Sequence, residues 1–145
     1  MSLMRVMDIA GTAMSAQSVR LNTVASNLAN ADSISSSANT TYKARKPVFQ
    51  AMLESASASF SGNSNDSQSV GVRIAGIVES DSPAIMEYHP DHPLANEDGY
   101  IFRPNVNTVE EMADMMSASR SYQTNVQIAE VAKTLLAQTL RLGKG

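Results

Sequence analysis

The sequence predicts a mainly α-helical protein in which two long terminal helices pack as a coiled-coil-like pair and carry a small β-rich insert. Three observations predict this fold: a row of apolar residues with heptad spacing near the N-terminus, a longer amphipathic stretch at the C-terminus, and β-branched runs between them. We therefore expect an N-terminal helix within residues 1–32, a loop and small β insert over 33–107, and a C-terminal helix within 108–145.

The N-terminal helix is predicted from Ser2 to Asn30, with Ser2 as its cap. Its apolar side chains follow a seven-residue repeat, which is the spacing of one helix face in a coiled coil. An ordinary helix packed on its own C-terminal partner explains the same pattern, and the two interpretations are compatible. The residues of this face are Leu3, Met7, Ala10, Met14, Leu21, Val24 and Leu28.

The C-terminal helix is predicted from Thr108 to Leu142. Thr108 and Glu111 have the spacing of a capping box, and Gly143 provides a stop. Such a helix would be roughly 50 Å long, which is more than a chain of this size can cover, so we expect part of its apolar surface to contact other chains. The residues expected to pack between helices or subunits are Met112, Met115, Tyr122, Val126, Ala129, Leu135, Leu136 and Leu140.

The insert between the two helices shows several short β signals. Residues 70–78 are rich in β-branched side chains and predict a strand, with Gly76 as a bulge or bend. Residues 83–88 and 100–102 predict two more short strands, each beside a turn. Residues 48–53 fit either a strand or a helical turn, so we expect three or four strands in all.

Composition excludes several classes of protein. The net charge of −3 gives no electrostatic reason to expect a nucleic-acid partner, and the chain has no cysteine for disulfide or thiol chemistry. The Ser-rich segment 55–69 has low complexity and predicts a loop. No apolar run is long enough to span a bilayer, and Arg5 and Asp8 interrupt the N-terminal stretch, so we expect no cleaved secretory signal.

One group of side chains in the insert suggests chemistry, namely Glu87, His89, Asp91 and His92. Histidines and carboxylates are the side chains that bind zinc. Two prolines interrupt this segment, its spacing is not that of a helical pair, and the chain holds only two histidines, so a surface turn is favoured. We expect no metal, no cofactor and no enzymatic activity. A small metal-dependent hydrolase using His89 and His92 is the enzyme hypothesis that this expectation opposes.

Three asparagines lie in the second half of the N-terminal helix: Asn22, Asn27 and Asn30. Asparagine disfavours a helix unless its side chain finds a hydrogen-bond partner. Helix fraying and capping is one explanation, and fixing the register against a neighbour is the other. The spacing alone does not separate the two.

The stretches around these asparagines and at the start of the C-terminal helix resemble bacterial flagellar rod and hook proteins, in particular the short proximal-rod members. The resemblance covers about residues 1–32 and 85–143. The matching stretches are 21–32, 42–43, 99–101, 104–112 and 117–126. The motif residues within them are Asn22, Asn27, Asn30, Asn105, Asn107, Glu110, Glu111, Arg120, Tyr122 and Asn125.

The resemblance implies a structural subunit of the proximal rod, exported by the flagellar type III system without a cleaved signal peptide. Its terminal helices would build the helical axial tube that transmits torque and forms the wall of the export channel. The implied partners are the rod proteins FlgB, FlgF and FlgG, the rod-base adapter FliE, the membrane ring FliF and copies of the chain itself, with no nucleic acid and no small-molecule substrate. A rod member of the FlgB or FlgF type is the alternative within the family, and a free-standing helical binding module is the alternative outside it.

Overall fold

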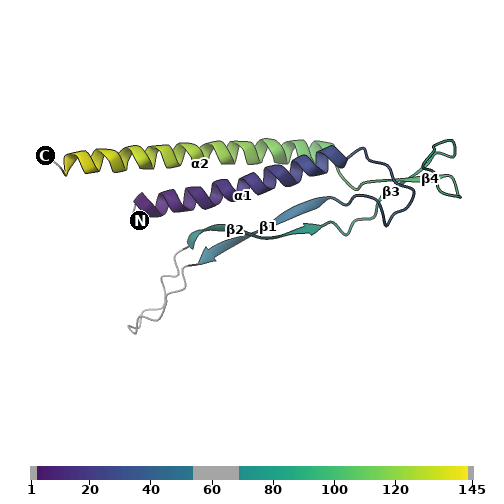
Figure 1. The fold of residues 1–145 in the computed structure, drawn as a ribbon, viewed down its shortest axis with the longest axis horizontal. Coiled ribbons are helices and arrows are strands. Elements are labelled where there is room, and N and C mark those ends of the chain that lie inside the picture. The colour runs from purple at the N-terminus through teal and green to yellow at the C-terminus, as the bar shows by residue number, and fades with distance from the viewer. Residues whose placement is uncertain (1–2, 54–68, 144–145) are drawn as a thin grey trace, which may run out of the picture.

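The computed structural model describes residues 3–53 and 69–143 and contains two long helices joined by four strands (Figure 1). This arrangement confirms the predicted fold class. The predicted cap at Ser2 and most of the predicted loop over 55–69 lie outside the described residues. The elements in chain order are α1 (Leu3–Asn30), β1 (Arg45–Leu53), β2 (Ser69–Glu79), β3 (Ile85–Tyr88), β4 (Tyr100–Arg103) and α2 (Thr108–Leu142).

The helices α1 and α2 lie side by side and antiparallel, and both chain ends are at the same end of the molecule (Figure 1). Of the described helices and strands, only α1 packs closely along α2. The buried residues Ala118 and Ala132 therefore mark the side of α2 that faces α1. Small side chains at these positions allow two helix axes to approach closely. None of the described helices is long and apolar enough to cross a membrane.

The strands β1 and β2 form an antiparallel hairpin that covers the other side of α1 (Figure 1). Residues 48–53, which the sequence left open, are a strand because they pair with β2. Val48 pairs with Gly76 and Phe49 with Ile74, so Ala75 is the extra residue of a bulge beside Gly76. The predicted strand and its irregularity at Gly76 are therefore confirmed.

The strand β2 comes close to α1 at Gly71. This glycine has a φ of +153°, and a Cβ atom at this position would collide with the side chain of Thr12. The Thr12 hydroxyl accepts a hydrogen bond from the backbone N–H of Val72 at 3.3 Å. The missing side chain thus allows β2 to pack against the helix.

The strands β3 and β4 form a second antiparallel pair beyond the end of the helices, from Ile85 opposite Arg103 to Tyr88 opposite Tyr100. The loop after α1 joins the free edge of β4, because Ser35 and Phe102 exchange two backbone hydrogen bonds of 2.9 and 3.0 Å. The two strands confirm the predicted short strands of this region.

The helix α2 has the predicted bounds and stop, but a different cap. Asn107 is the N-cap, and its side-chain oxygen accepts hydrogen bonds from the backbone N–H groups of Val109 at 3.1 Å and Glu110 at 3.4 Å. The prediction that Thr108 caps the helix is wrong, because Thr108 is already the first helical residue. At the other end the Gly143 N–H bonds to the carbonyl oxygen of Thr139 at 3.1 Å, which confirms the predicted stop.

Candidate assembly surfaces

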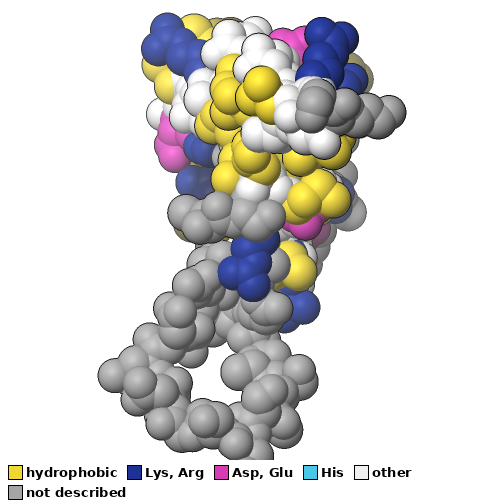
Figure 2. Space-filling view, turned by 90° about the vertical axis from the view of Figure 1, so that its left-hand side faces the viewer, with side chains coloured by type: hydrophobic (Ala, Val, Ile, Leu, Met, Phe, Trp, Pro, Cys, Tyr) yellow, Lys and Arg dark blue, Asp and Glu magenta, His cyan; other side chains and the backbone are white. Residues whose placement is uncertain are grey.

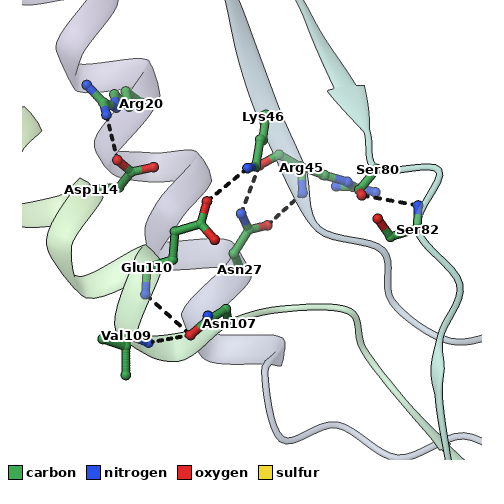
Figure 3. Close-up of polar contacts among 10 residues, drawn as sticks. All are labelled: Arg20, Asn27, Arg45, Lys46, Ser80, Ser82, Asn107, Val109, Glu110 and Asp114. Atoms are coloured by element: carbon green, nitrogen blue, oxygen red, sulfur yellow. Dashed lines mark hydrogen bonds and ion pairs between the residues drawn. The ribbon is translucent and has the colours of Figure 1, made fainter.

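Asn27 holds the insert against the first helix (Figure 3). Its side-chain Nδ2 donates to the carbonyl oxygen of Arg45 at 2.8 Å, and its Oδ1 accepts from the Arg45 N–H at 2.9 Å and from the Tyr42 hydroxyl at 2.8 Å. Asn27 has no exposed surface. Its carboxamide thus pairs with β1 as the peptide group of a neighbouring strand would, and it fixes where the hairpin leaves the helix.

Asn105 makes a second bridge within the insert. Its Oδ1 accepts from the Ala44 N–H at 2.8 Å, and its Nδ2 donates to the carbonyl oxygen of Ser82 at 2.7 Å. It therefore joins the residue before β1 to the segment after β2.

The other motif asparagines have smaller roles. Asn30 donates to Ser26 and Asn125 to Ser121, each one turn back in its own helix, and Asn22 is exposed. Asn27 therefore bonds to a strand of its own chain, so it fixes the position of a neighbouring element and is not a fraying or capping residue.

Ion pairs join the two helices and the hairpin (Figure 3). Arg20 of α1 contacts Asp114 of α2 at 2.7 Å, and Lys46 of β1 contacts Glu110 of α2 at 3.2 Å. Glu111, the next residue, is only 4% exposed, and its Oε2 atom has no hydrogen-bond partner. The predicted capping-box hydrogen bond from Glu111 back to Thr108 is absent between these two described residues.

Many large apolar side chains of α2 remain exposed although α1 packs along this helix. The exposed fractions are 51% for Met112, 36% for Val126 and 66% for Leu140. Tyr122 and Leu135 are exposed as well, whereas Met115, Ala129 and Leu136 are half-buried, and Arg120 is exposed among them. These exposed residues run from the edge of the α1 contact round one flank of α2 to its far side. Because little in the described chain covers them, we define Met112, Met116, Tyr122, Val126 and Leu140 as the outer apolar face of α2.

The predicted apolar face of α1 is covered to a much greater extent. Ala10 and Val24 are buried. The half-buried members of the same face are Leu3, Met7, Met14, Leu21 and Leu28.

An apolar groove runs between the start of α1 and the C-terminal half of α2. It has a volume of about 380 Å³ and is lined by Leu3, Val6, Thr124, Gln127, Ile128, Val131, Ala132 and Leu135. The end view in Figure 2 shows hydrophobic side chains gathered over this end of the helix pair, with Lys and Arg side chains towards the edges. Exposed apolar surface of this extent is typical of a contact with another protein.

The histidine segment forms a surface turn next to β3. His89 contacts the Glu87 carboxylate at 3.0 Å through Nε2, and this hydrogen bond lowers the pKa of Glu87 below its ordinary value of 4.5. Arg103 adds to the lowering of this pKa. His92 uses Nδ1 to accept the Leu94 N–H at 3.1 Å. Among the described residues, no group of three or more His, Cys, Asp or Glu is placed to hold a metal ion.

Two known sequence families match the two ends of this fold. The family described as "Flagella basal body rod protein" matches residues 7–33, which cover most of α1. The family described as "Flagellar basal body rod FlgEFG protein C-terminal" matches residues 97–142, which cover β4 and α2. Both ends of the chain therefore match flagellar basal-body rod proteins, and all ten motif residues of the sequence lie within the matched ranges.

Full-length relatives identify the member of this class. The flagellar basal-body rod protein FlgC of Salmonella typhimurium is 43% identical, that of Escherichia coli O6:H1 is 44% identical, and that of Bacillus subtilis is 34% identical. Each match covers 99% of this chain and the whole of the relative. The chain belongs to the FlgC family of flagellar basal-body rod proteins. It is a structural subunit of the basal-body rod and not an enzyme, and it assembles with other components of the flagellar basal body.

Proposed function

We propose that this chain builds the proximal rod through its two terminal helices, as part of the helical axial tube that transmits torque and forms the wall of the export channel. Its neighbours in this proposal are FlgB, FlgF, FlgG, FliE and FliF, together with further copies of the chain. It reaches the periplasm through the flagellar type III system and keeps its N-terminus. The observation that carries the proposal is the outer apolar face of α2.

This face supports assembly on energetic grounds. The helix α2 has 35 residues, and α1 backs it on one side only. Burying a large apolar side chain stabilises a contact by roughly 1.5–3 kcal/mol before entropy is counted. Met112 and Leu140, which are each more than half exposed, leave much of this stabilisation unused in the isolated chain, and Val126, at 36% exposed, leaves a smaller part of it. A neighbouring subunit that covers the outer apolar face would supply it.

The two sides of the molecule also differ, which favours a tube over a closed pair. One side presents the outer apolar face of α2, and the other presents the β1–β2 hairpin. A contact between unlike surfaces of identical subunits repeats head to tail and forms a helical array unless the rotation closes into a ring. Asn27 fixes the hairpin to α1, so each subunit would present both surfaces in a constant geometry.

The test is to place a charge in the outer apolar face. Val126→Asp should lower the number of basal bodies with rods by at least about tenfold in a host that lacks the native gene, because a carboxylate would be buried without a partner. Asn22→Asp adds the same charge at an exposed position of α1, outside the outer apolar face, and is the matched control. Electron microscopy of isolated basal bodies counts the rods, and swimming assays measure the consequence. Normal rods with Val126→Asp would refute the proposed use of this face.

A further inference from the structure

Glu111 is a buried carboxylate that lacks a donor. It lies in the first turn of α2, is 4% exposed, and its Oε2 atom has no hydrogen-bond partner. Burying a carboxylate costs much free energy unless a cation or several donors compensate for the lost water. A donor from outside the described chain would remove this cost.

Glu111 lines a pocket of about 250 Å³ between α1, β1 and the start of α2. The residues around it are Arg20, Val24, Arg45, Lys46, Pro47, Phe49, Glu111 and Asp114. Each cation in this lining already has its own carboxylate, since Arg20 pairs with Asp114, Lys46 with Glu110 and Arg45 with Glu79. Among the described acids that line the pocket, Glu111 is the one without a cation, so the pocket has the charge balance to take one more cation.

Arg120, on the outside of α2, is a cation that lacks an acid partner among the described residues. It is exposed, and its guanidinium makes no hydrogen bond or ion pair with any residue that the structure describes. It follows the buried Ala118 by two residues, which places it about 200° around the helix, on the side away from α1. Met116, one turn earlier, is 60% exposed. If assembly buries this side of α2, Arg120 needs an acid partner from the neighbour.

We propose that Arg120 of one copy enters the pocket of an adjacent copy of this chain and donates to the Glu111 carboxylate. The proposal rests on the proposed function, because it needs the outer side of α2 to be a contact between subunits. Arginine fits this pocket better than lysine, since its planar group can bond a carboxylate and stack on an aromatic ring at the same time. Phe49, which is 41% exposed, supplies such a ring in the lining.

Cysteine cross-linking in isolated basal bodies tests the pairing directly, because the sequence contains no cysteine. A host without the native gene expresses two copies together, one with Lys46→Cys at the pocket and one with Ser117→Cys, one turn before Arg120. A short bis-maleimide should join them into a product of two chains. Gln138→Cys replaces Ser117→Cys as the control, because it lies on the same side of α2 as Arg120 but about 27 Å further along.

The product of two chains from Lys46→Cys and Ser117→Cys, without one from Gln138→Cys, is the expected result. Rods that contain both variants but give no such product would overturn the pairing and leave the proposed function standing. A product that joins Ser117→Cys to a different rod protein would overturn the choice of a second copy as the partner. If rods do not contain even the unsubstituted chain, the proposed function fails, and the pairing that needs it is overturned as well.

Single and double substitutions separate an ion pair from two unrelated structural roles. Glu111→Gln and Arg120→Gln should each lower the number of rods by at least about tenfold, because each leaves one buried charge without its partner. The fold-decrease in rod number for the double variant should be smaller than the product of the two fold-decreases for the single variants. Thermal unfolding of the purified variants shows whether either change damages the subunit itself. Independent losses that simply multiply, or a neutral Glu111→Gln, would refute the pairing.

Discussion

Replacing Asn27 should weaken the subunit more than any exposed asparagine of α1. Asn27→Ala removes three hydrogen bonds, two to the backbone of Arg45 and one to the Tyr42 hydroxyl. At about 1 kcal/mol each they contribute about 3 kcal/mol, and the better helix propensity of alanine returns about 0.5 kcal/mol. The free energy of unfolding should therefore fall by about 2.5 kcal/mol, which corresponds to a decrease in Tm of about 5–10 °C.

The assay is thermal and urea unfolding of the purified chain, followed by circular dichroism. Asn22→Ala is the matched control, because Asn22 is exposed on the same helix and gains the same propensity without losing a described contact. The control should keep its Tm or raise it slightly. If both variants unfold at the same temperature, the bridge from Asn27 to β1 does not stabilise the subunit in solution, and our explanation of the hairpin position is wrong.

Two further predictions concern the cap of α2 and the turn next to β3. Asn107→Ala should lower the free energy of unfolding by about 1 kcal/mol, because the N–H groups of Val109 and Glu110 lose their acceptor. Thr108→Ala should lower the free energy of unfolding by less. A larger loss from Thr108→Ala than from Asn107→Ala would refute the assignment of Asn107 as the cap. His89→Ala should raise the pKa of Glu87 towards 4.5 in an NMR titration, since the His89 hydrogen bond is the main cause of its low value. At pH values above the pKa of Glu87 in the unfolded chain, ionised Glu87 therefore stabilises the fold. This stabilisation is lost as the pH falls through the lower pKa that Glu87 has in the folded chain. An unchanged titration would contradict this cause.

Local patterns were sufficient to predict the helices. The bounds of α2 follow from periodicity and from Gly143, and the irregularity at Gly76 follows from a glycine within a β-branched run. The cap was displaced by one residue, because Asn107 and Thr108 both have capping side chains and only the backbone of Asn107 is non-helical. Residues 48–53 could not be assigned from their own sequence, since pairing with β2 determines their conformation.

The side of α2 that meets α1 was harder to derive from the sequence. Large apolar residues such as Met112 and Leu140 dominate the periodic pattern, whereas the buried side contains Ala118 and Ala132. Alanine gives a weak hydropathy signal even where two helices pack most closely. The role of Asn27 was equally hard to derive from the sequence, because its partner Arg45 is 18 residues away and bonds through its backbone.

The central claim, that the outer side of α2 becomes a contact between subunits, is tested most directly by chemical accessibility. Val126→Cys places a single thiol on the outer apolar face, at a side chain that is 36% exposed in the isolated chain. A maleimide should label it readily in the purified subunit and much more slowly in intact basal bodies that contain rods. Equal labelling in the two preparations would show that this face remains open to solvent in the rod and would contradict the claim.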